Sequence, residues 1–233
     1  MKLAIMQPYF FPYIGYFQLI NAVDKFIFYD DVNFIKGGWI NRNKILIDGQ
    51  AKYVNLLMNG ASSSKLINQI IVNTKVNHKT IKTLSQSYNK APYFEDVMPL
   101  LERYFLSLEH EIPVSKAAGE SIKLTADYLG LNIVFEYSSE QYSHTKTYKR
   151  ADRLIEIAKE NNAQSYINAE GGKELYTKEY FAKQGIELSF IKNNICEYQQ
   201  FNKEFTPYLS IIDVMMFNSP EKIREMLDDY ELE

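Results

Sequence analysis

The sequence is poor in the features that mark several large classes of protein. Its one cysteine, Cys196, excludes an internal disulfide and a cysteine-rich zinc site, and it fits a reducing cytoplasm. No stretch approaches the ~18 apolar residues of a membrane-spanning helix, and the opening MKLAIMQ runs into prolines too soon for a signal peptide. The net charge of −3 gives no general attraction to nucleic acid. We therefore expect a cytoplasmic protein with no membrane span and no nucleic-acid partner.

Histidines close in sequence to possible metal ligands or to a nucleophilic serine are also scarce. His78 and His110 lie in polar stretches without further ligands at metal spacing, so no metal site is predicted. The serines of the loop Ser62 to Ser64 have no histidine at a spacing typical of nucleophilic catalysis.

Aromatic residues, by contrast, are abundant. The chain has 18 tyrosines and 14 phenylalanines among 233 residues, with an ordinary 46% of hydrophobic and 24% of charged residues. Packing of the core and stacking on a ligand both remain open as explanations for the many rings. The length suits one large core, and we expect a single α/β domain over residues 1–233.

The first thirty residues predict a βαβ unit. Lys2 to Met6 is a short apolar run that ends before Pro8, Ile14 to Val23 has helical spacing, and Lys25 to Tyr29 is a second apolar run. Strand, helix and strand in this order are typical of a parallel sheet. Met6 and Tyr29 should then end neighbouring strands, and a ligand should lie at that edge.

The remaining chain predicts a mostly parallel, Rossmann-like sheet flanked by helices. Asp48-Gly49 between two apolar runs indicates an inserted β-hairpin, and Ile67 to Val72 is predicted as a strand. Residues 77–130 have helical spacing and are expected to form a helical segment or subdomain. Strands and helices alternate again from Asn132 to Lys192, followed by two helices that end at Tyr230.

The loop after the first strand holds the first group of predicted substrate-binding residues. It is so rich in rings and prolines that some of them must face a cleft rather than the core. Tyr13-Ile14-Gly15-Tyr16 has the position of the His-x-Gly-His turn of nucleotidyltransferases, but tyrosine carries no positive charge near neutral pH. We assign substrate binding to Gln7, Tyr9, Phe11, Tyr13 and Tyr16.

Asp30 and Asp31 follow the second strand and are the predicted catalytic residues. One carboxylate would act as general base, while alternation along the strand would turn the other away to brace the next loop. Two alternatives stay open: both aspartates bind Mg²⁺ beside a nucleotide, or they only cap the strand end.

Two glycine-containing loops complete the predicted binding residues. Trp39, Asn41, Arg42 and Asn43 follow a glycine pair and combine a ring, amides and a cation, which suits an anionic ligand such as a nucleotide sugar. Gly171, Gly172 and Lys173 lie between a predicted strand and helix and could bind an anion. Solvated surface loops are the alternative interpretation of the first group.

Several of these segments together resemble the WbqC-like protein family. They are MQPYFFPYIGYFQLI, Asp30-Asp31, Trp39 to Asn43, Tyr166 to Lys173, and Phe205-Thr206-Pro207 with Leu209 to Asp213. The resemblance implies a role in bacterial surface-polysaccharide and O-antigen biosynthesis.

The function expected from this resemblance is a transferase that modifies a nucleotide-linked amino sugar by acyl or aminoacyl transfer. The cofactor is not defined by the sequence; an acyl or aminoacyl donor, or a nucleotide with Mg²⁺, would serve. A nucleotidyltransferase-like enzyme and a non-catalytic nucleotide-sugar-binding protein are the alternatives. The sequence does not fix the oligomeric state, and a homo-oligomer is one of the states it allows.

Overall fold

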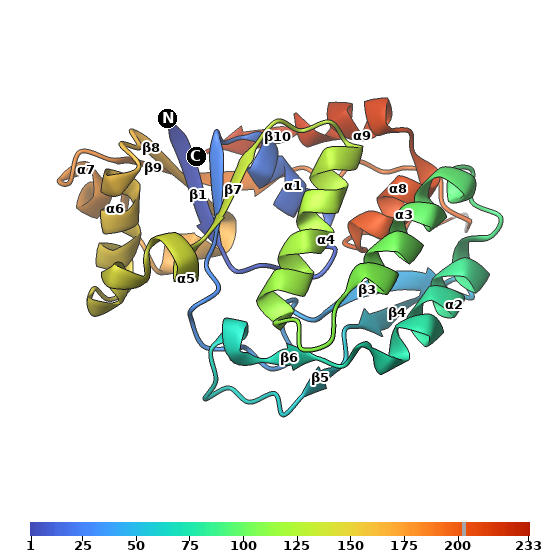
Figure 1. Ribbon diagram of the computed structural model, residues 1–233. Helices are drawn as coiled ribbons and strands as arrows, with labels where there is room; N and C mark the ends of the chain where they lie inside the picture. Colours follow the sequence, from blue (N-terminus) through green and yellow to red (C-terminus); the bar gives the residue numbers. More distant parts are fainter. Residues whose placement is uncertain (202–203) are drawn as a thin grey trace.

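A computed structural model describes residues 1–201 and 204–233, and its main sheet has six strands (Figure 1). The strand order is β10-β9-β8-β1-β2-β7. Their bounds are β1 Lys2–Met6, β2 Lys25–Phe28, β7 Val134–Tyr137, β8 Ser165–Ala169, β9 Glu187–Asn193 and β10 Tyr230–Leu232.

The first two strands are parallel neighbours, as predicted. Met6 pairs with Phe28, and the Tyr29 N–H donates to the Met6 carbonyl at 2.8 Å. Both strands therefore end at the same edge of the sheet, which confirms the predicted edge.

The last strand makes the sheet mixed. β10 runs antiparallel to β9, with Tyr230 opposite Asn193, whereas the other strand pairs are parallel. The prediction of a helix reaching Tyr230 is wrong here, because α9 (Pro220–Leu227) ends at its cap Asp228. A strand of three residues is too short to show a period in the sequence.

Helices cover both faces of the sheet (Figure 1). α1 (Ile14–Asn21) and α9 pack together over one face, where Ala4, Phe26 and Phe28 join the larger core. α6 (Ala151–Glu160) and α7 (Lys178–Ala182) lie over the other face, where Leu3 and Ile5 join a second core. The central strands are therefore apolar on both faces, as expected for parallel strands.

A second layer of short strands and helices lies beside the α1 face (Figure 1). Residues 77–130 are mainly helical, as predicted. The strand predicted at Ile67 to Val72 comprises only the last two of these residues, because the preceding residues form a 3-10 turn. Two antiparallel pairs, β3–β4 and β5–β6, lie outside the main sheet. The elements of this layer are β3 Arg42–Ile47, β4 Gln50–Asn55, β5 Met58–Asn59, η1 Ile67–Gln69, β6 Ile71–Val72, η2 Thr74–Val76, α2 Asn77–Tyr88, α3 Phe94–Ser107, α4 Val114–Tyr128 and α8 Ile211–Phe217.

The connections that remain are short helical turns at the edge of the main sheet. They are α5 Ser138–Gln141 and η3 Ser143–Thr147 after β7, and η4 Glu170–Glu174 after β8. Among the described residues, no helix is both long and apolar enough to cross a membrane.

The strand order contains one reversal that matters for ligand binding. From β1 the chain moves outward to β2 and β7, and then returns to β8 on the other side of β1 before it reaches β9. The connections leave β1 and β8 in opposite directions, which opens a crevice at the carboxyl ends of these two strands. Ligands of open α/β sheets bind at such a switch point.

Candidate functional site

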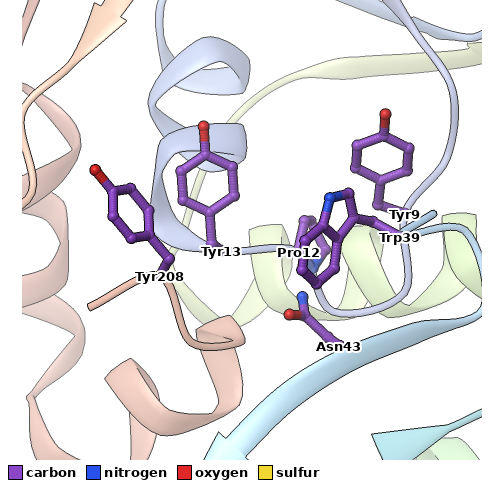
Figure 2. A pocket seen from close by; sticks show the side chains of 6 residues that line it. All are labelled: Tyr9, Pro12, Tyr13, Trp39, Asn43 and Tyr208. Atoms are coloured by element: carbon purple, nitrogen blue, oxygen red, sulfur yellow. The ribbon is translucent and has the colours of Figure 1, made fainter. Parts of the chain in front are cut away.

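Two cavities lie at the carboxyl edge of the sheet and share the side chain of Tyr9. The first has a volume of about 230 Å³ and is lined mainly by rings; the second has a volume of about 380 Å³. The first is lined by Tyr9, Pro12, Tyr13, Trp39, Asn43 and Tyr208, and we call it the aromatic cavity (Figure 2). The second we call the strand-end cavity.

The strand-end cavity lies at the switch point. Met6 and Gln7 contribute from the end of β1, and Asn168 and Ala169 from the end of β8. Its polar groups are amides, tyrosine hydroxyls and backbone, which suits a ligand with hydroxyl groups. It is lined by Ile5, Met6, Gln7, Tyr9, Tyr29, Leu154, Tyr166, Asn168, Ala169, Gly171, Gly172, Leu175 and Tyr176.

The aromatic cavity is built from three distant segments of the chain. Figure 2 shows Tyr13 and Tyr208 next to each other, Tyr9 and Trp39 on the other side, and Asn43 approaching from β3. The ring centroids of Tyr13 and Tyr208 lie 6.2 Å apart. No charged residue lines either cavity among the residues that the structure describes. The aromatic cavity therefore suits an uncharged, ring-shaped part of a ligand.

Gly15 and Asn193 hold the Tyr13 ring. The ring lies so close to Gly15 that a Cβ at this position would be 2.4 Å from it, and the hydroxyl donates to Asn193 Oδ1 at 3.0 Å. Burial, with the neighbouring Tyr208, Tyr9 and Glu170, raises the pKa of Tyr13 to about 12. The Tyr13 hydroxyl is therefore protonated near neutral pH and acts as a hydrogen-bond donor.

The loop between β1 and α1 divides its rings between core and cavity. Phe10 and Phe11 are fully buried in the core, while Tyr9 and Tyr13 line the aromatic cavity. Tyr16, predicted to bind substrate, is buried and donates its hydroxyl to the Gln7 carbonyl at 2.8 Å. Of the five residues predicted in this loop, Gln7, Tyr9 and Tyr13 line a cavity, and Phe11 and Tyr16 line neither.

Asp30 and Asp31 form a buried network with the chain after β7. Ser138 Oγ lies 2.5 Å from Asp31 Oδ1 and 3.2 Å from Asp30 Oδ1, and the Ser139 N–H and hydroxyl donate to Asp30 at 3.0 and 2.8 Å. The expectation that the two carboxylates face opposite sides is wrong, because β2 ends at Phe28 and strand alternation stops before Asp30. Neither aspartate lines the aromatic cavity or the strand-end cavity.

The two carboxyl groups differ in charge environment. Burial raises the pKa of Asp30 above its ordinary value, against the opposing effect of the bonds from Ser139. Burial also acts to raise the pKa of Asp31, but bonds from Arg153 and Ser138 outweigh it, and the pKa lies below the ordinary value.

A magnesium site does not fit these residues. Arg153 Nη2 and Lys146 Nζ lie 2.7 and 3.3 Å from Asp31 Oδ2, so two cations already surround the carboxylate that would bind the metal. Lys146, in η3, and Arg153, on α6, thus bind a carboxylate of the chain itself. Elsewhere in residues 1–201 and 204–233, no group of three or more His, Cys, Asp or Glu side chains is placed to hold a metal ion.

The predicted residues around Trp39 have mixed positions. Trp39 and Asn43 line the aromatic cavity, whereas Asn41 donates to the Leu56 carbonyl at 3.1 Å. Arg42 donates to the carbonyls of Gly37 and Gly38, and its guanidinium lies 4.3 Å above the Tyr53 ring. Arg42 therefore holds the turn that carries Trp39 and lies outside both cavities.

The glycine pair after β8 reaches the strand-end cavity, and the lysine does not. Gly171 and Gly172 line it, and a Cβ at Gly172 would lie 2.7 Å from Asn168 Nδ2. Lys173 pairs with Glu170 and Glu233 at the surface.

Sequence reasoning missed several lining residues. Asn168 follows the buried core of β8 at the carboxyl edge, and this position could have indicated it. Tyr29 ends the second apolar run at the same edge and could have been found in the same way. Tyr208 and Tyr176 come from loops far away in the sequence, and nothing in their surroundings indicates a cavity.

The fold and the cavities define an α/β protein with a mostly parallel sheet and two neighbouring cavities, lined by uncharged residues, at the carboxyl edge of that sheet. The chain matches the WbqC-like protein family over residues 7–225 and belongs to this family, which confirms the resemblance seen in the sequence.

Two further comparisons describe the relatives. The chain is 26% identical over 224 residues to the uncharacterized protein Rv1507c of Mycobacterium tuberculosis (strain ATCC 25618 / H37Rv), and the match covers 93% of each protein. No solved structure gives a significant match to the chain.

Proposed function

We propose that the protein is a transferase that binds a nucleotide-linked amino sugar and modifies it by acyl or aminoacyl transfer, in the biosynthesis of bacterial surface polysaccharide such as O-antigen. Membership of the WbqC-like family supports the biosynthetic role. The observation that carries the binding role is the pair of cavities that meet at Tyr9.

The two cavities differ in a way that matches the two parts of such a ligand. The aromatic cavity has four ring side chains and suits the flat, uncharged nucleobase. The strand-end cavity has Gln7, Asn168 and backbone groups, which suit the hydroxyl groups of a sugar. A ligand that passes Tyr9 would occupy both.

Asp30 is the proposed general base. Its raised pKa brings it closer to the range in which a carboxylate accepts a proton effectively, whereas Asp31 is held ionised by Arg153. The Asp30 carboxylate is buried. The hydroxyl of the partly buried Ser139 donates a hydrogen bond to Asp30 Oδ2 at 2.8 Å. Ser139 and Asp30 line neither cavity, so a sugar amine that gives its proton to Asp30 would have to reach the partly buried Ser139 hydroxyl from outside both cavities.

A non-catalytic nucleotide-sugar-binding protein is the second candidate. The specific observation in its favour is that no charged side chain of the described residues lines either cavity. The residues at the two histidine positions of the His-x-Gly-His turn argue against a nucleotidyltransferase. Tyr13 donates to Asn193 and Tyr16 is buried against Gln7, so neither supplies positive charge to a phosphate.

Trp39 provides a direct test because it is the single tryptophan and lines the aromatic cavity. Titration with nucleotide-linked amino sugars should change Trp39 fluorescence, and a ligand at 100 times its Kd should stabilise the fold by ~2.7 kcal/mol. Tyr13→Leu should abolish the fluorescence response. Tyr148→Leu is the matched control, since Tyr148 is exposed and lines neither cavity.

The second step separates the enzyme from the binding protein. Mass spectrometry of the bound amino sugar after incubation with acyl-coenzyme A or aminoacyl donors should detect an acylated product. Binding without product for any donor class would favour the binding protein. The absence of any ligand-dependent change at Trp39 would contradict both proposals.

A further inference from the structure

We propose that Asn43, Ser121 and Ser210 are positioning residues for the aromatic cavity and that they act through the backbone of Phe11. The consequence for ligand binding rests on the proposed function; the positioning itself rests on geometry alone. Each of the three side chains comes from a different part of the fold, and each bonds to the backbone N–H or to the carbonyl of Phe11.

Phe11 has a strained backbone. Its φ is +37°, in the left-handed region that residues other than glycine rarely adopt. Its ring is fully buried, and its centroid lies 5.0 Å from that of Tyr104, so the residue cannot relax by turning outward. Such a conformation persists only where the surroundings fix it, and it is commonly found near functional sites.

Three buried side chains fix this conformation. Ser121 Oγ, on α4, accepts the Phe11 N–H at 3.0 Å. Asn43 Nδ2, on β3, and Ser210 Oγ, at the N-cap of α8, each donate to the Phe11 carbonyl at 2.7 Å. Both backbone groups of Phe11 are therefore held by elements that are distant in sequence.

The position of Phe11 determines the cavity wall. The next two residues, Pro12 and Tyr13, line the aromatic cavity, and the preceding Phe10 N–H donates to the Trp39 carbonyl at 3.0 Å. A change in the Phe11 backbone would thus move the rings of Tyr13 and Trp39 relative to each other.

Asn43 in this arrangement serves the cavity indirectly. Its Nδ2 donates to the Phe11 carbonyl and its Oδ1 accepts the Lys44 N–H at 2.8 Å. Both ends of the amide are engaged within the protein, although the side chain lines the cavity. We therefore assign Asn43 the same positioning role as the two serines.

Ser121→Ala tests the proposal because it leaves the Phe11 N–H without an acceptor. Hydrogen exchange measured by mass spectrometry should become at least about fivefold faster over residues 9–13, the effect of one lost hydrogen bond. Exchange in β1 and β2 should not change. Ser121→Thr, which keeps the hydroxyl, should restore slow exchange. Ser87→Ala is the matched control, since Ser87 Oγ donates to the Thr83 carbonyl within α2.

Ligand binding provides the second measurement. The Kd of a nucleotide-linked amino sugar should rise by a similar factor in Ser121→Ala, with Ser121→Thr close to the parent. If Ser121→Ala does not fold, Ser210→Ala tests the same idea from the carbonyl side of Phe11. A uniform increase of exchange over the whole chain, or no increase over residues 9–13, would overturn the proposal.

The exchange measurement needs no ligand. If the parent protein binds no nucleotide-linked amino sugar, the proposed function fails while the positioning role is still decided by residues 9–13. If the parent binds and Ser121→Ala changes neither exchange nor Kd, the positioning role fails while the proposed function stands.

Discussion

At the scale of single residues, the position of a ring depends on the small residue beside it. Tyr13 lies against Gly15, and Asn168 lies almost as close to Gly172 in the strand-end cavity. Both glycines have ordinary negative φ, so they are required for space and not for backbone conformation.

Gly15→Ala should separate cavity shape from stability. The added methyl would displace the Tyr13 ring and break its bond to Asn193, so nucleotide-sugar binding should weaken at least tenfold, or ~1.4 kcal/mol. Alanine favours a helix by up to ~1 kcal/mol over glycine, which offsets the ~1 kcal/mol of the lost hydrogen bond, so thermal stability should change little. Calorimetry and thermal denaturation measure the two effects. If Gly15→Ala still weakens binding in a Tyr13→Leu background, this explanation is wrong.

Asp30→Asn tests the proposed general base. Asparagine keeps the shape of the side chain but cannot accept a proton, so turnover should fall by ~10²–10⁴-fold while nucleotide-sugar binding is retained. Asp48→Asn is the control, because Asp48 is an exposed turn residue of the β3–β4 pair. Turnover equal to that of the parent would remove Asp30 from the mechanism.

The sequence could predict part of the site at this scale. Gln7, Tyr9 and Tyr13 follow a strand that is recognisable from its apolar run, and the edge rule places them near a ligand. Which neighbouring rings enter the core could not be predicted. Phe11 turns inward because of its left-handed backbone, which depends on Asn43, Ser121 and Ser210.

At the scale of elements, the turn between Gly37 and Asn41 is held by a cation. Arg42 Nε donates to the Gly38 carbonyl at 3.2 Å, and Gly37 has a φ of +76°. The guanidinium then packs over Tyr53 on β4. The planar guanidinium suits both contacts at once, which a lysine could not make.

Arg42→Ala should therefore act on the turn. Loss of the two carbonyl contacts and of packing on Tyr53 should lower the free energy of unfolding by about 1–2 kcal/mol and shift Trp39 emission to longer wavelength. Lys44→Ala is a close control, since Lys44 Nζ lies 5.5 Å from the Tyr53 ring centroid without bonding to the turn. An unchanged Trp39 spectrum in Arg42→Ala would show that the turn does not need Arg42.

The prediction of secondary structure succeeded for elements long enough to show a period in their apolar residues. The helical spacing of residues 77–130 corresponds to α2, α3 and α4, because each of these helices spans three or more turns. β6 and β10 have two and three residues, and their pairing partners, not their own sequence, determine them. The same limit explains the wrong strand over Ile67 to Val72.

At the scale of the whole molecule, the strand order was beyond sequence reasoning. Local patterns indicate that β7, β8 and β9 exist, but β7 joins β2 while β8 joins β1. That choice creates the switch point and with it the strand-end cavity. It depends on contacts between residues more than a hundred positions apart, for which a single sequence carries no direct signal.

Two buried carboxylates connect distant parts of the fold. Asp31 joins the end of β2 to Arg153 on α6 at 2.7 Å. Asp213, on α8, accepts hydrogen bonds from Tyr88 and Tyr198 at 2.7 Å and from Gln200 at 2.8 Å. The first is paired with a cation, and the hydrogen-bond donors of the second among the described residues are neutral.

This difference in partners predicts opposite effects of pH on stability. For Asp31, bonds from Arg153 and Ser138 outweigh burial and lower the pKa, so its contribution is present above the unfolded pKa and is lost as pH falls through the folded one. For Asp213, burial outweighs its donors Tyr198, Tyr88 and Gln200 and raises the pKa. Its contribution is therefore largest below the unfolded pKa and declines as pH rises through the folded one.

Urea denaturation of the parent, Asp31→Asn and Asp213→Asn across a range of pH measures both contributions, because asparagine does not titrate. As pH rises from about 4, near the unfolded pKa of aspartate, the stability difference between the parent and Asp213→Asn should shrink. The stability difference between the parent and Asp31→Asn should persist over this range and disappear only below about pH 4. At neutral pH this difference should be ~3–5 kcal/mol, because Arg153 loses its buried partner. Two differences that change with pH in the same direction would contradict the assignment, since the pKa of Asp31 lies below the ordinary value and that of Asp213 above it.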